Sequence, residues 1–167
     1  EQWDEGFNPN IRASYETAMA TAEADIAWAR VRQMELIRAT HQAMMAADVD
    51  VVICPGVSVA PFPWHHLYPT EIDGAPVDNY MAWLTLTAAW TVVGHPVVAL
   101  PAGTDADGLP FGIQVVGHRY CDRRLLAAAR ALESAWHDTE FTRPRPDFEA
   151  LSATDVDLSP DSTADIF

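Results

Sequence analysis

The residue types that most often carry catalysis are sparse in this sequence and do not form a complete site. Ser58 follows Pro55-Gly56-Val57, but no Gly-x-Ser-x-Gly turn surrounds it. The other serines lie at predicted helical positions or near the C-terminus. All ten basic residues are arginine, so the chain offers no lysine as a general base or Schiff-base nucleophile. A serine-hydrolase triad built wholly from this chain is therefore not expected.

The histidines are the next candidates for chemistry. His65 and His66 are adjacent, and they lack the i,i+4 spacing with which two histidines chelate zinc on a helix. We interpret them as solvated loop residues and expect no metal site. His95 lies between Gly94 and Pro96 at the entry to an apolar strand, and strand ends in α/β sheets often bind ligands. A structural role, with the ring bonded to the backbone, is the more common alternative.

Several glycines cluster in the second half of the chain without forming a phosphate-binding loop. Gly103, Gly108, Gly112 and Gly117 do not follow the Gly-x-Gly-x-x-Gly pattern, and they flank predicted strands rather than open a helix. We interpret them as turn and bulge residues and expect no nucleotide or other cofactor.

Composition limits the class of protein. The 167 residues suit one main domain, and the net charge of −14 disfavours nucleic acid or an anionic membrane as a partner. Two cysteines form no disulfide framework, which favours a reducing, cytoplasmic location. No apolar run reaches the roughly 18 residues of a membrane span. The chain starts at Glu1 without a signal-like segment or a methionine, so we expect it to begin inside a longer reading frame.

The hydrophobic pattern predicts helices and apolar strands in turn. Residues 11–46 predict one long helix, and Val51–Cys54 predict a strand buried on both faces, with Cys54 as a buried thiol. Residues 55–77 predict a long loop with five prolines and three aromatic residues. A helix capped by Asp78 follows, and Trp28, Trp83 and Trp90 at helical positions are expected in the core or an interface.

The remaining pattern predicts a β-hairpin, a helix and a tail. Two apolar strands, residues 97–100 and 111–116, flank an Asp-Gly turn. A final helix from Asp122 is expected to bury four positions at steps of four, three and four: Leu125, Ala129, Leu132 and Trp136. We therefore expect a folded unit over residues 1–137 and an acidic, solvated tail over residues 138–167.

Three motifs follow one another with a characteristic spacing. They are Gly94-His95-Pro96, Pro101-Ala102-Gly103 and Gly108-Leu109-Pro110-Phe111-Gly112-Ile113-Gln114. With the strand that precedes them, residues from about 38 to 136 resemble the C-terminal region of the amidase signature family. Gly56 and Thr91 depart from the residues that many members have, threonine and asparagine, and these departures bear on substrate more than on membership.

The resemblance implies an α/β fold in which this chain is the C-terminal part of an amidase-signature mixed sheet core flanked by helices. It implies hydrolysis of a carboxamide or linear amide by a Ser–cis-Ser–Lys triad, with backbone N–H groups of a Gly/Ser-rich stretch binding the oxyanion. No catalytic residue can be assigned to this chain, because it contains neither that stretch nor a lysine. Its implied role is to complete the sheet and to wall one side of the substrate pocket.

Position alone makes four residues candidates for substrate binding: Trp64, Tyr68, Trp83 and His95. The implied partners are the remaining N-terminal part of the amidase, on the same or a separate chain, and a small-molecule amide; a homodimer stays open. Two alternatives also stay open. One is a portion of the larger, amide-cleaving component of a tRNA-dependent amidotransferase, which the acidity and the Gly94-His95-Pro96 variant disfavour. The other is a binding domain without catalysis.

Overall fold

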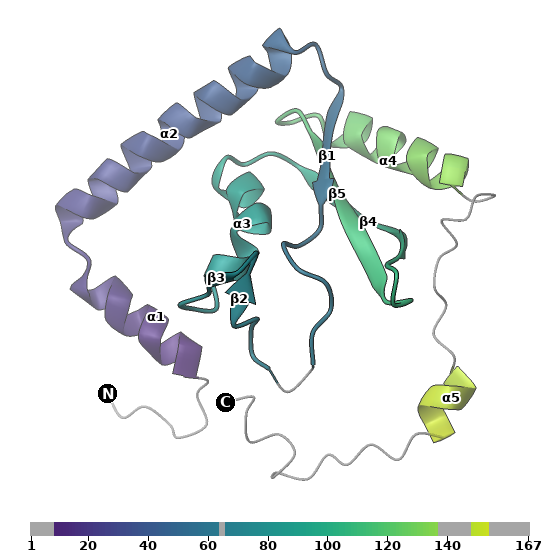
Figure 1. The fold of residues 1–167 in the computed structure, drawn as a ribbon. Helices are drawn as coiled ribbons and strands as arrows, with labels where there is room; N and C mark the ends of the chain where they lie inside the picture. The colour runs from purple at the N-terminus through teal and green to yellow at the C-terminus, as the bar shows by residue number, and fades with distance from the viewer. Residues whose placement is uncertain (1–8, 64–65, 137–147, 154–167) are drawn as a thin grey trace.

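The computed structural model describes residues 9–63, 66–136 and 148–153, and a three-stranded antiparallel sheet lies at its centre (Figure 1). The strands are β1 (Val51–Pro55), β4 (Val97–Thr104) and β5 (Pro110–Gly117), in the order β1-β5-β4. The apolar, β-branched runs of the sequence form these strands, as expected. Because β5 is the central strand, its residues Val115 and Val116 are completely buried.

The turn between β4 and β5 is stabilised by an aspartate side chain. The carboxylate of Asp105 accepts hydrogen bonds from the backbone N–H groups of Asp107 (3.0 Å) and Leu109 (2.8 Å). Gly108 supplies the positive φ, 80°, that the turn requires. The predicted hairpin is therefore confirmed, and it fixes the register of the two longest strands.

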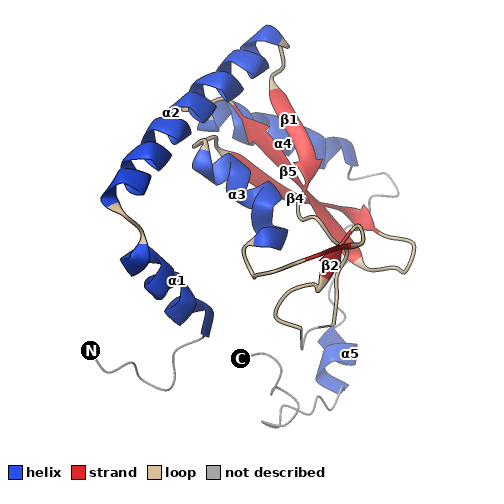
Figure 2. Ribbon diagram, turned by 60° about the vertical axis from the view of Figure 1, so that its left-hand side comes forward, coloured by secondary structure: helices blue, strands red, loops and turns tan. Residues whose placement is uncertain are grey.

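One face of the sheet packs against α4 (Asp122–Trp136), which Figure 2 shows behind the strands. Leu125 and Ala129 are buried there with Leu100 and Val115, as the helical spacing predicted. Gly117 allows this close approach, because a Cβ atom at that position would lie 2.9 Å from the Cβ of Leu125. Its glycine is architectural, as the sequence indicated.

The opposite face carries the short helix α3 (Thr85–Val92), preceded by the 3-10 turn η1 (Ala82–Leu84). The prediction that Asp78 caps this helix is wrong. The side chain of Asn79 instead accepts hydrogen bonds from the N–H groups of Met81 (3.0 Å) and Ala82 (3.2 Å). The tighter 3-10 turn therefore starts one residue later, and the α-helix itself is shorter than predicted.

Two further departures concern the N-terminal helix and the long loop. The expected single helix is divided into α1 (Pro9–Ala20) and α2 (Glu23–Ala46). The hydroxyls of Thr17 and Thr21 donate to carbonyls four residues earlier, a pattern that often bends helices, and Ala22 is extended. The expected loop contains a small hairpin, β2 (Glu71–Ile72) and β3 (Ala75–Pro76).

The expectation that β1 is buried on both faces is also wrong within this chain. β1 and β4 are both edge strands among the described residues, and Ile53 and Val97 keep 49% and 38% of their surface exposed. Trp28, expected in a core or interface, is 68% exposed on α2. These apolar surfaces lack the cover that their composition predicts.

The acidic segment lies largely outside the described residues, namely at 137–147 and 154–167. Within it, the structure describes one short helix, α5 (Phe148–Ala153), where the sequence predicted no regular element. Across the described part of the chain, no helix combines the length and apolarity of a membrane span.

The exposed strand edges and apolar residues lead to a first prediction. The isolated 167-residue chain is expected to be poorly soluble or loosely folded, because one face of the sheet and most of α2 have too few neighbours to bury them. Thermal unfolding followed by near-UV circular dichroism should be broad, and the chain should bind a hydrophobic dye. A sharp cooperative transition of a monomeric chain would contradict this expectation.

Candidate functional site

The polar groups of the second sheet face gather around Cys54 at the end of β1. Cys54 pairs in register with Gln114 of β5, so both side chains project from the same face. The amide Nε2 of Gln114 donates to the carbonyl oxygen of Pro55 (3.0 Å) and lies 3.7 Å from the Cys54 sulfur. Trp90 of α3 donates its indole N–H to the same sulfur at 3.3 Å. This network fastens α3 to the end of β1.

His95 lies beside this network and is buried. Its Nδ1 is 2.8 Å from the carbonyl oxygen of Gly117, and because a carbonyl only accepts, Nδ1 carries the proton. Its Nε2 is buried without a hydrogen-bond partner among the described residues. The ring meets Trp90 edge to face, with centroids 6.2 Å apart. His95 therefore joins the entry of β4 to the end of β5 and supports the indole of Trp90.

An aromatic cluster forms a second layer, built from the loop after β1 and from η1. Trp83 meets Phe62 at 5.7 Å and Tyr80 at 6.3 Å between ring centroids, and Tyr80 meets Tyr68 at 6.5 Å. All three contacts are edge to face. Ser58 donates to the backbone carbonyl of Trp83 at 3.3 Å, which ties the loop to η1. The loop is therefore ordered by its aromatic residues, as the sequence indicated.

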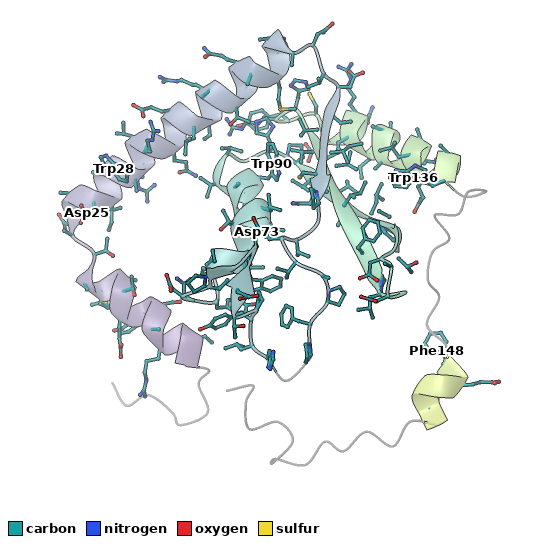
Figure 3. The ribbon with its side chains drawn as sticks, in the orientation of Figure 1. Asp25, Trp28, Asp73, Trp90, Trp136 and Phe148 are labelled. Atoms are coloured by element: carbon teal, nitrogen blue, oxygen red, sulfur yellow. The ribbon has the colours of Figure 1, made fainter. Side chains whose placement is uncertain are left out.

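The structure brings only some of the candidate substrate-binding residues together. Tyr68 and Trp83 belong to the aromatic cluster, joined through Tyr80, whereas His95 belongs to the buried network below. Trp64 lies outside the described residues. Figure 3 shows Trp90 on α3 next to the sheet and Trp28 on α2, well apart from it.

Sequence reasoning missed the contribution of Cys54, Gln114 and Trp90. The apolar run predicts a buried thiol at Cys54, but this residue is half-exposed and accepts two N–H groups. The useful signal is the antiparallel register, since a partner for Cys54 follows only once β1 is paired with β5. The helical position of Trp90 indicated burial and gave no partner.

The site offers binding groups and no catalytic pair among the described residues. The hydroxyl of Ser58 donates to a backbone carbonyl rather than to a base. Across the described residues, no three His, Cys, Asp or Glu side chains gather as metal ligands, and His66 is exposed. Aromatic faces and neutral hydrogen-bonding groups of this kind suit recognition of a small, partly apolar molecule.

Comparison with known proteins assigns the same stretch to one type of enzyme. A family model described as Amidase matches residues 3–126. A solved structure described as "Crystal structure of amidase" superposes with a TM-score of 0.69 at 28% identity; the match covers 78% of this chain and 29% of that one. The antiparallel sheet, its helices and the N-terminal arm thus belong to a matched region.

Two relatives show how much of their length the chain accounts for. One is a glutamyl-tRNA(Gln) amidotransferase component from Methylorubrum extorquens, its A-type polypeptide; the chain is 33% identical to it over 100 residues, covering 60% of this chain and 19% of the relative. The other is the putative amidase AmiB2 of Mycobacterium bovis, 29% identical over 119 residues, covering 67% and 24%. The chain therefore spans a fifth to a quarter of the length of these relatives.

The buried amide of Gln114 gives the second prediction. Gln114→Glu places a carboxylate against the Pro55 carbonyl, so the free energy of unfolding of the native gene product should fall by about 3 kcal/mol. The loss should shrink as the pH is lowered, because a protonated glutamate can donate again. Gln42→Glu, the same change at an exposed position of α2, should cost less than about 0.5 kcal/mol. Equal effects at both positions in denaturant titrations would contradict the role given to Gln114.

Proposed function

This chain belongs to the amidase family, and from that premise we propose that it is the C-terminal part of an amidase that hydrolyses a carboxamide or linear amide. The observation that carries the proposal is the match to an amidase structure of which the chain accounts for 29%. The chain contains no lysine. The nucleophilic serine, the bridging serine and the lysine base of the proposed Ser–Ser–Lys mechanism therefore lie in the remaining, N-terminal part.

The chain contributes the wall of the substrate pocket in this proposal. Tyr68 and Trp83 present aromatic rings from the cluster after β1, and Trp64 belongs to the same loop. His95 is buried, so it acts by holding the indole of Trp90 in place rather than by direct contact. Aromatic side chains suit the apolar part of an amide substrate, while the charge changes of the reaction take place on the N-terminal part.

A second candidate function is a portion of the amide-cleaving component of a tRNA-dependent amidotransferase, with ATP and tRNA among its partners. The 33% identity to a glutamyl-tRNA(Gln) amidotransferase polypeptide supports this candidate. The net charge of −14 speaks against tRNA contact by this part of the protein, because nucleic-acid affinity depends on Lys and Arg at phosphates.

The third prediction tests the function itself. The reading frame before Glu1 is expected to encode a lysine followed by a Gly-Ser-Ser-Gly-Gly stretch. The native gene product should then release ammonia or an amine from carboxamides and anilides, and replacement of that lysine by alanine should abolish the release. Turnover that depends on ATP, glutamine and Glu-tRNA would establish the second candidate instead. A frame without these residues, and a product without turnover, would point to a binding domain.

The fourth prediction concerns the pocket wall. Trp64→Ala and Tyr68→Ala in the active gene product should each raise KM about tenfold or change substrate preference, because each removes an aromatic face worth about 1–2 kcal/mol. Tyr120→Ala is the matched control, since Tyr120 is 85% exposed in a turn away from the cluster. Its KM should stay within about twofold of the unmodified protein. Unchanged KM and preference in either loop variant would remove that residue from the pocket.

A further inference from the structure

The N-terminal arm, α1 and α2, exposes more apolar surface than an independent unit leaves in water. On α2, Val31, Met34 and Met45 are 62%, 49% and 60% exposed. With Ala27 they lie within a sector about 60° wide on one side of the helix, and we call these four residues the α2 apolar stripe. On α1, Ile11 and Met19 are exposed as well.

The stripe is not the side by which α2 contacts the rest of the chain. That side is marked by Met44, which is buried, by Gln33, which donates to the Val92 carbonyl at 2.8 Å, and by His41, which meets the His118 ring. A third side of α2 carries the exposed Arg32–Glu35 ion pair and faces solvent. Figures 1 and 2 both show α1 and the first half of α2 standing away from the sheet.

We propose that the α2 apolar stripe is the docking surface for the N-terminal part of the amidase. This inference rests on the proposed function. Two observations favour that occupant. The family match, residues 3–126, includes the whole arm, so the arm belongs to the common fold rather than to an added segment. The chain also accounts for only 29% of the superposed amidase, so most of that fold lies outside these residues.

A second copy of the chain is the rival occupant. It would leave the arm paired with itself while the edges of β1 and β4 stayed open, because those edges lie on the sheet and not on the arm. A large N-terminal part can cover both the arm and the sheet. The structure therefore favours the N-terminal part over self-association.

The fifth prediction uses the adjacent methionines Met44 and Met45 as a matched pair. The protein is purified from its source cells through a C-terminal tag, with whatever polypeptide accompanies it, and treated with dilute hydrogen peroxide. Met44 is 4% exposed and Met45 60% exposed in this chain. If the stripe is covered, Met34 and Met45 should oxidise as slowly as Met44, at least tenfold more slowly than a free methionine peptide. Rapid oxidation of Met34 and Met45 would overturn the proposal.

The composition of the same sample identifies the occupant. Mass spectrometry and sedimentation should find the stripe protected in a species that contains an amidase N-terminal part. Protection in a species made of two copies of this chain, without that part, would overturn the proposal. A reading frame and a preparation that lack an amidase N-terminal part would overturn it as well.

A charge placed in the stripe supplies an independent check. Val31→Glu together with Met45→Glu should reduce the yield of the assembled protein at least tenfold. Ala39→Glu, on the side of the Arg32–Glu35 pair, should leave the yield within twofold. Equal yields from the two proteins would overturn the docking surface.

Amide hydrolysis by the same preparation separates the two proposals. Hydrolysis with exposed Met34 and Met45 would refute the docking surface and leave the function standing. Covered methionines beside the N-terminal part, without hydrolysis of any carboxamide or anilide, would refute the function and leave the docking surface standing.

Discussion

The pairing of β5 with a strand on each side is the constraint on which the rest of the structure depends. β5 takes β1 on one edge and β4 on the other, both antiparallel, and this registers Cys54 opposite Gln114. Glycines permit the close approaches around it: Gly112 lies under the carbonyl of Leu100, and Gly117 lies under α4. If β5 shifted by one residue, Val115 and Gln114 would exchange faces, and both the core and the polar network would be lost.

Two layers of different chemistry follow from that sheet. On the α4 face, packing is apolar and close, with Leu125 and Ala129 against Val115. On the other face, a hydrogen-bonded network holds Trp90 and α3, and the aromatic cluster extends this layer outward. The first layer is a core that needs no further partner. The second layer has unpaired buried nitrogens on His95 and Trp83 among the described residues, as expected of a face that other groups complete.

The success of sequence reasoning followed the range of the interactions. The β4–β5 hairpin and α4 were predictable because their signals are local: an Asp-Gly turn and apolar steps of three and four. The break at Ala22 and the cap at Asn79 depend on competing hydrogen bonds that residue types alone do not rank. The exposed edge of β1 was not predictable, because an apolar run records burial in a complete protein. For the same reason the sequence pointed to Tyr68 and Trp83 individually, and their connection through Tyr80 required the fold.

The bulge in β4 has a consequence for the behaviour of this chain during synthesis. An eight-residue edge strand is a template on which another chain can add a strand and start aggregation. In β4, Pro101 has no N–H to offer, and the register shift between Pro101 and Gly103 bends the strand at the same point. A foreign strand therefore finds only the first half of the edge, Val97 to Leu100, in regular form. This irregularity acts as a gatekeeper while the edge waits for its proper neighbour.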